Sequence, residues 1–176
     1  MGYGSFVWGF IFLFDINIGG FDILPDFVAY IFFIVGLKTL KKLNDHFERA
    51  NTLSIILLVV SLFFLFIRSI QLGGFEWIIG LGVTIVSVMH IYSLCMGIEE
   101  EAIKHDLLGL ADLTRKRWRL YLMVICSLFI AAFLPHPIIM MLVFVFAIVS
   151  YGLMIDLMSR ANRELKQELY VNPIDY

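Results

Sequence analysis

The stretch Phe75–Ile98, FEWIIGLGVTIVSVMHIYSLCMGI, decides the fold class of this chain. It is apolar almost throughout and carries one charged residue, Glu76. A helix rises about 1.5 Å per residue, so a helix of this length crosses the roughly 30 Å of hydrocarbon in a bilayer. A transmembrane β-barrel is excluded, because its strands would alternate apolar and polar residues over about ten residues. The stretch therefore predicts a membrane-spanning helix.

Five further apolar runs predict additional membrane-spanning helices along the rest of the chain. They cover roughly residues 3–21, 23–40, 52–70, 118–134 and 138–158. Of the 176 residues, 61% are hydrophobic and 16% are charged, whereas about a quarter of a soluble globular domain is charged. The sequence thus predicts an all-α polytopic membrane protein: one domain, residues 1–176, folded as a bundle of six transmembrane helices in three helical hairpins.

Basic residues gather between alternate runs. The thirteen Lys and Arg residues include one, Arg68, beside the third gap; the other twelve lie in the second gap, in the fourth gap or after the last run. These twelve are Lys38, Lys41, Lys42, Arg49, Lys104, Arg115, Lys116, Arg117, Arg119, Arg160, Arg163 and Lys166. Cytoplasmic loops of membrane proteins carry such an excess. We therefore expect a multi-pass protein of the plasma (inner) membrane with both termini cytoplasmic.

The first two runs leave a second topology open. Asp15 interrupts the first run, and Gly19 and Gly20 follow it, which allows a tight reversal of the chain. Pro25 then falls in the first turn of the next helix, where its missing N–H costs least. A re-entrant hairpin is the alternative to two full spans. It changes the number of crossings and leaves the basic bias intact.

Two segments are predicted to be amphipathic and cytoplasmic, residues 99–117 and 159–170. Carboxylates at the carboxyl end of a helix oppose its dipole, so we expect the fourth helix to continue past Ile98, with Glu100 and Lys104 as an i,i+4 ion pair. An apolar stripe then suits the bilayer surface or a neighbouring helix. Its members are Ile103, Leu107 and Leu110.

One candidate site is acidic and lies on the outer side. It comprises Asp15, Asp22, Asp26, Arg68 and Glu76. A lone carboxylate in lipid costs a few kcal/mol, so it should face protein or a water-filled cavity. The functional interpretation is an outward-facing cavity for a cation or a positively charged small molecule. The structural alternative is an ion pair between Asp15 and Arg68 with two helix-capping aspartates.

A second candidate site is a polar layer about 12 Å above the inner ends of four runs. Its members are Ser61, His90, Ser127 and Ser150. A substrate or a proton relay would suit this level. Serines in membrane helices also commonly bond their own backbone, and a single histidine lacks the second nitrogen ligand of a haem or zinc site. No metal, no cofactor and no catalytic residue is therefore predicted, and Cys95 and Cys126 are expected to be free thiols.

The segment 21–40, FDILPDFVAYIFFIVGLKTL, follows an apolar run interrupted by an aspartate. It resembles small multi-pass bacterial membrane proteins that are themselves uncharacterised. The likeness rests on Asp22-Ile23-Leu24-Pro25-Asp26 and Gly36-Leu37, and it covers about a fifth of the chain. It implies residence in the bacterial inner membrane and transfers no activity. In size and topology the chain also looks like the substrate-binding subunits of energy-coupling-factor vitamin transporters, an analogy that does not fix a function.

The leading hypothesis is a small membrane protein that binds, or helps to transport, a small ligand through the outer acidic cavity. The alternative is a regulatory or scaffold protein that acts on a protein partner through its cytoplasmic loop and tail. An enzyme is disfavoured, because no phosphate-binding loop, HExxH motif or nucleophile elbow is present. Expected partners are the lipid bilayer, a small ligand, and a protein partner or a second copy. Nucleic acid is not expected, because the basic residues lie at the ends of the spans.

Overall fold

The computed structural model describes residues 2–13, 17–18, 21–22, 26–67, 75–133 and 136–171. Within these ranges the backbone alone is described at 17–18, 21–22, 65–67, 75–77 and 166–171. The elements, in chain order, are α1 (Gly2–Phe12), β1 (Asn17–Ile18), β2 (Phe21–Asp22), α2 (Asp26–Leu40), α3 (Asp45–Ile67), α4 (Phe75–Lys104), α5 (Leu108–Phe133) and α6 (Pro137–Val171). The predicted helical fold class is confirmed. The addition is a minimal antiparallel pair, β1 with β2, in which Asn17 pairs with Asp22.

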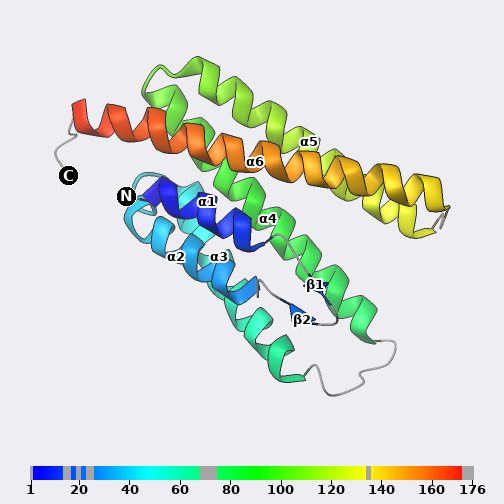
Figure 1. Ribbon diagram of the computed structural model, residues 1–176. Coiled ribbons are helices and arrows are strands. Elements are labelled where there is room, and N and C mark those ends of the chain that lie inside the picture. The colour runs from blue at the N-terminus through cyan, green and yellow to red at the C-terminus, as the bar shows by residue number, and fades with distance from the viewer. Residues whose placement is uncertain are drawn as a thin grey trace.

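The helices form a closed ring in chain order. Each described helix packs on the next one along the chain, and α6 returns to pack on α1. Helices α4 and α6 barely touch each other. Both ends of the described chain lie at the same end of the bundle as the α2–α3 and α4–α5 connections (Figure 1). We call this the basic end, because the three groups of Lys and Arg described above belong to these connections and to the carboxyl-terminal part of α6.

Side-chain hydrogen bonds hold the connections of the basic end together. Asn44 precedes α3, and its Oδ1 accepts from the Phe47 backbone N–H at 2.9 Å, which makes Asn44 the N-cap of that helix. Asn44 Nδ2 donates across to the Gly97 carbonyl (3.2 Å) and to Glu101 Oε1 (3.0 Å) of α4. Lys104 Nζ donates back to the Leu43 carbonyl at 3.3 Å. The α2–α3 turn is therefore fixed to the carboxyl end of α4.

Three of the described helices contain stretches long and apolar enough to cross a membrane. These stretches are Asp45–Phe64 in α3, Ile78–Lys104 in α4 and Pro137–Leu165 in α6. In contrast, α1 has 11 residues and α2 has 15. At 1.5 Å per residue they are about 16 and 22 Å long, short of the roughly 30 Å of hydrocarbon. Within the apolar run 3–21, helix α1 ends at Phe12, and the next described helix begins at Asp26.

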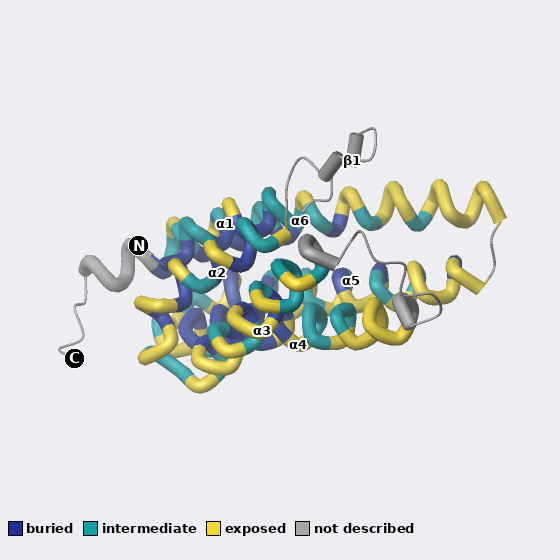
Figure 2. Tube along the Cα trace, turned by 90° about the horizontal axis from the view of Figure 1, so that it is seen from below, coloured by how far each residue is buried: buried dark blue, intermediate teal, exposed yellow. Residues whose placement is uncertain are grey.

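The first third of α6 exposes apolar side chains around its whole circumference. Large side chains are exposed at ten of the twelve positions from 138 to 149, which is more than three helical turns: Ile138, Ile139, Met140, Met141, Leu142, Phe144, Val145, Phe146, Ile148 and Val149. Figure 2 shows the same exposure along the neighbouring part of α5, where Phe133 is 84% exposed. Exposed apolar surface of this extent is foreign to a soluble monomer and is typical of a surface that contacts lipid or a partner.

Helices α1 and α2 cross at two glycines. A Cβ atom added to Gly36 would lie 2.6 Å from the Gly2 carbonyl oxygen and 2.6 Å from Phe6 Cε1. Neither contact can be relieved by a flexible side-chain end, since one partner is backbone and the other is a buried aromatic ring. Small residues at such a crossing let two helix backbones approach closely.

Replacing Gly36 with alanine should therefore destabilise the fold by about 1–3 kcal/mol through overpacking. The matched control is Gly152→Ala in α6, where nothing lies within 4 Å of the added Cβ. There alanine should be neutral or stabilising by up to about 1 kcal/mol, because it favours helix over glycine. Melting of the detergent-solubilised variants measures both effects, and equal melting temperatures for the two would contradict the crossing geometry.

Candidate functional site: a polar cavity inside the helix ring

A cavity of about 200 Å³ lies inside the ring, where the end of α1 meets α2, α4, α5 and α6. Its lining is mostly polar or aromatic, and α3 contributes none of it. The lining residues are Leu13, Asp26, Tyr30, Val83, Ser87, His90, Ile91, Tyr121 and Tyr151. Leu13 and Asp26 border the α1–α2 connection, at the ends of those helices away from the basic end. The cavity thus joins this connection to the middle of α4.

Helical periodicity explains how two of these helices supply several lining residues each. Asp26 and Tyr30 are separated by one helical turn on α2, and Ser87, His90 and Ile91 share one face of α4. Tyr30 is 5% exposed, and its hydroxyl hydrogen-bonds the Ser87 side chain. This bond ties α2 to α4 across the cavity wall.

A side chain of α3 contacts His90 on the side away from the cavity lining. Its Nε2 lies 2.9 Å from Ser54 Oγ, and both side chains are buried. Ser54 Oγ also donates to the Ala50 carbonyl at 2.8 Å. Ser54 therefore bonds both the backbone of α3 and the imidazole of α4, and which of Ser54 and His90 donates to the other depends on the tautomer of the ring.

Aromatic rings enclose the remaining walls. The ring of Phe33 meets the His90 ring edge-on, with centroids 4.9 Å apart, and Tyr30 meets it with centroids 6.3 Å apart. Tyr151 donates its hydroxyl to the Leu13 carbonyl at 3.3 Å, which satisfies an acceptor at the end of α1. Tyr121 stacks on Trp118 with centroids 6.2 Å apart. The cavity thus combines π-faces, hydroxyls, one imidazole and one carboxylate.

The lining contains groups that can attract a cation. A carboxylate supplies charge, and tyrosine faces attract cations through their quadrupoles. Among the described residues the hydrogen-bond partner of His90 is Ser54, which is also bonded to the Ala50 carbonyl. Among the described residues no group of three His, Cys, Asp or Glu side chains could hold a metal ion, and Cys95 and Cys126 are free.

The predicted acidic group is described in part. Asp26 lines the cavity. Asp15 and Arg68 lie outside the described residues. Asp22 belongs to β2 and Glu76 to the first turn of α4, and the side chains of both lie outside the described part. The predicted pairing of Asp15 with Arg68 stays a prediction.

The four residues of the predicted inner polar layer make different contacts and do not form one site. Ser61 Oγ donates to the Leu58 carbonyl at 2.9 Å, and Ser127 Oγ donates to the Val124 carbonyl at 2.7 Å, so both bond within their own helices. Ser150 Oγ is buried and has no hydrogen-bond partner among the described residues. His90 lines the cavity. The sequence did not predict its partner Ser54, which lies near the start of the apolar run 52–70. Helix α3 begins seven residues before that run, at Asp45, so Ser54 is already more than two turns inside the helix.

The predicted continuation of the fourth helix is confirmed at the basic end. Helix α4 runs to Lys104, whose Nζ lies 2.9 Å from Glu100 Oε1. The expected apolar stripe divides, because Leu110 is buried in the core while Ile103 is half exposed. Leu107 packs against the edge of the core. The turn after α4 contains Asp106 with a φ of 59°, a left-handed conformation in which Asp is tolerated.

Several charges of the basic end pair with one another. Arg115 of α5 donates two hydrogen bonds to Glu99 of α4, one from Nε at 3.0 Å, and this raises the pKa of the guanidinium. Asp156 of α6 accepts from Arg160 at 3.1 Å and from Arg117 at 3.4 Å. Asp112 pairs with Lys116 at 2.6 Å, and the hydrogen bond from that lysine lowers the pKa of the carboxyl. Ion pairs therefore link α4, α5 and α6 at this end.

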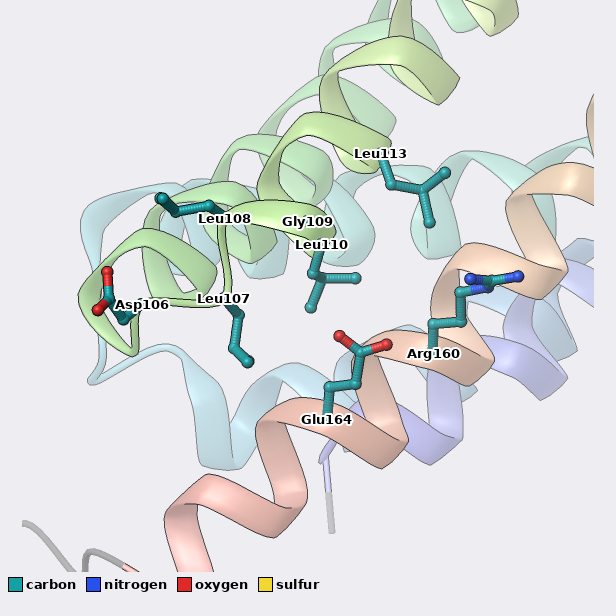
Figure 3. A pocket seen from close by; sticks show the side chains of 8 residues that line it. All are labelled: Asp106, Leu107, Leu108, Gly109, Leu110, Leu113, Arg160 and Glu164. Carbon is teal, nitrogen blue, oxygen red and sulfur yellow. The ribbon is translucent and has the colours of Figure 1, made fainter.

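A second cavity, of about 520 Å³, lies between the α4–α5 turn and α6. Arg160 and Glu164 of α6 face Leu107 and Leu110 across it (Figure 3). Its charged residues carry both signs, and Leu108 at its edge is exposed. It has no single chemical character that would select a ligand.

Protein-family models, curated proteins and solved structures give no match to this chain. The geometry of the cavity is therefore the basis of the functional argument.

The Ser54–His90 bond can be tested by deletion. Ser54→Ala removes the hydrogen-bond partner of a buried imidazole, so it should cost about 1–2 kcal/mol of stability. Ser61→Ala on the same helix removes only a bond within that helix and should be close to neutral. Thermal unfolding of both variants in detergent checks the difference. A Ser61→Ala loss as large as that of Ser54→Ala would be inconsistent with the bridging role.

Proposed function

We propose that this chain is an integral membrane protein of the bacterial plasma membrane with both termini cytoplasmic. Two observations support the proposal. The beginning of α6, residues 138–149, exposes large apolar side chains around its circumference, and the end of α5 exposes several more, which water would penalise and lipid accepts. The basic residues gather at one end of the bundle, as the positive-inside tendency requires of a cytoplasmic end.

Helix lengths favour the re-entrant topology over six full spans. In the proposed topology α3, α4, α5 and α6 cross the membrane: α3, α4 and α6 contain the three long apolar stretches, and α5 has 26 residues. Helices α1 and α2, about 16 and 22 Å long, reach only part of the way through the hydrocarbon. Non-helical backbone at membrane depth is tolerated where it is buried in protein or lines a cavity. The position of the cavity beside the α1–α2 connection meets that condition. An even number of crossings keeps both termini on one side.

Cysteine labelling tests the orientation. In a background with Cys95→Ala and Cys126→Ala, single cysteines are placed at three exposed positions, Lys42, Lys116 and His136. A membrane-impermeant maleimide applied to intact cells should label the cysteine at 136 and leave those at 42 and 116 unlabelled until the cells are permeabilised. The reverse pattern would place the basic end outside and reject the proposed topology.

Within this topology we propose that the cavity binds a small organic cation, either to retain it or to assist its transport. The carrying observation is the single carboxylate, Asp26, in one small cavity with the tyrosines Tyr30, Tyr121 and Tyr151. An ionisable side chain in a membrane protein typically faces such a cavity and marks a binding site. A desolvated cation over an aromatic face gains about 2 kcal/mol. The volume, about 200 Å³, is below the roughly 300–1,000 Å³ of drug-sized sites, so the ligand is small.

Binding to the purified protein tests this function. Asp26→Asn should weaken the binding of small ammonium ions about two- to fivefold, because Asp26 is an exposed carboxylate of the cavity lining and a solvent-accessible charge pair contributes about 0.5–1 kcal/mol. The control is Asp112→Asn, an exposed carboxylate at the basic end that should leave binding unchanged. Calorimetric titration with a panel of small ammonium ions gives both affinities. Equal affinities for the two variants would reject the cavity as the site.

The regulatory or scaffold alternative has weaker support. The carboxylates Glu99, Asp112 and Asp156 of the basic end already pair with arginines or lysines of this chain, so the charge left for a partner there is mainly that of exposed lysines and arginines such as Lys41 and Lys42. The exposed side chains of Ile103 and Leu108 favour this alternative, and both are also suited to contact with the bilayer surface.

A further inference from the structure

We propose that the exposed face of α2 binds a phospholipid with an anionic headgroup, such as phosphatidylglycerol, at the basic end of the bundle. Lys38, Lys41 and Lys42 bind the headgroup, and apolar side chains of the same face contact the acyl chains. This inference rests on the proposed membrane topology, in which the basic end is cytoplasmic, and it is independent of cation binding in the cavity.

The exposed face of α2 changes from apolar to basic along the helix. Ile31 is 44% exposed and Val35 is 55% exposed, and Lys38 is exposed as well. Spacings of four and three residues place these side chains on one side of the helix. From residue 31 to residue 38 the helix rises about 10 Å. Half of the hydrocarbon thickness is about 15 Å, so the apolar part of this face lies at the depth of acyl chains in one leaflet.

The lysines lie where the headgroups of that leaflet begin. Helix α2 ends at Leu40 at the basic end, and Lys41 and Lys42, both exposed, follow in the turn (Figure 1). Anionic lipids are concentrated in the cytoplasmic leaflet, and basic residues next to a membrane-embedded helix attract them. The apolar stem of a lysine can also follow the helix surface while its ammonium group reaches the headgroups.

The charge of these lysines is not neutralised by the described part of the chain. None of the three forms an ion pair with a described residue. Within the described ranges, three such cations in five consecutive positions occur only here. Carboxylates of α4, α5 and α6 engage other cations of the basic end, namely Lys104, Arg115, Lys116, Arg117 and Arg160. The α2 face is therefore the part of this end with clustered charge to offer to an anion.

The neighbouring start of α3, which packs on α2, adds little net charge. Arg49 is exposed there, and so are Asp45 and Glu48. Both carboxylates lie in the first turn of α3, where they stabilise the amino end of the helix. Lysines at the carboxyl end of α2 likewise stabilise that helix through its dipole. A role in the dipole alone predicts no dependence on the lipid headgroup, so the lipid can be tested directly.

Quenching by brominated lipids measures which lipid contacts the α2 face. A tryptophan replaces Val35 in a background with Trp8→Phe, Trp77→Phe and Trp118→Phe. In vesicles that mix phosphatidylglycerol with phosphatidylcholine, one of them brominated, its fluorescence gives the relative affinity of the two lipids. We expect a three- to tenfold preference for phosphatidylglycerol, as a few exposed charge pairs provide. A tryptophan at Met141, an exposed position near the start of α6, should report no preference.

Variants assign the preference to α2. Lys38→Gln combined with Lys42→Gln should lower it below twofold, whereas Lys38→Arg combined with Lys42→Arg should retain it. The matched control is Lys116→Gln combined with Arg160→Gln, which removes two positive charges that already pair with carboxylates of the chain and should leave the preference intact. Glycerol phosphate in solution has the headgroup chemistry without acyl chains, and it should not displace the lipid.

Each outcome has one meaning. Equal affinities of the two lipids at residue 35 would overturn the inference and leave the cavity unaffected. A preference that survives Lys38→Gln with Lys42→Gln, or that falls equally in the control, would overturn the assignment to α2. Displacement by glycerol phosphate would indicate a site for a soluble anion. A protein that does not insert into vesicles would reject the membrane topology itself. If the tryptophan background does not fold, native mass spectrometry of the wild-type protein and the lysine variants counts the retained phosphatidylglycerol instead.

Discussion

The register of α3 against α4 is the constraint on which the interior of this protein depends. Asn44 sets it, since one side chain caps α3 through Phe47 and donates to Gly97 and Glu101 of α4. Gly97 makes the approach possible, because a Cβ there would lie 2.7 Å from the Phe47 ring. With the two helices fixed at this level, Ser54 meets His90 further along the same interface. The position of His90 in the cavity lining thus depends on a cap at the end of the bundle.

The sequence predicted the parts of the structure that follow from periodicity and charge. Long apolar runs require helices, because no other backbone satisfies its own hydrogen bonds in lipid. Helix α4 continues through the Glu100–Lys104 pair because three carboxylates at its end would oppose the helix dipole. The grouping of the basic residues at one end follows from short connections between antiparallel helices. Each of these properties depends on composition within one or two turns of a helix.

The sequence did not predict the contacts that depend on how one helix is aligned against the next. Ser54 and Ser61 both lie on α3 and differ by two turns, and only packing decides that Ser54 reaches His90. Asp26 and His90 were assigned to separate outer and inner sites, yet they line one cavity. Their joint position arises because α1 and α2 are short, which an apolar run that extends past Phe12 does not reveal. Composition indicates which residues are apolar, and it does not indicate where a helix within an apolar run ends.

The short α1 also explains why a polar cavity exists in so apolar a protein. Helices α4 and α6 barely touch, whereas α1 packs on α2 and α6. A helix that ends leaves carbonyl groups without intrahelical partners, and Tyr151 of α6 satisfies one of them at Leu13. An apolar residue at 151 would leave that acceptor unsatisfied in hydrocarbon, at a cost of several kcal/mol. The Tyr151 hydroxyl in the cavity lining thus serves the end of α1, and the cation site that we propose includes a group that the fold already uses.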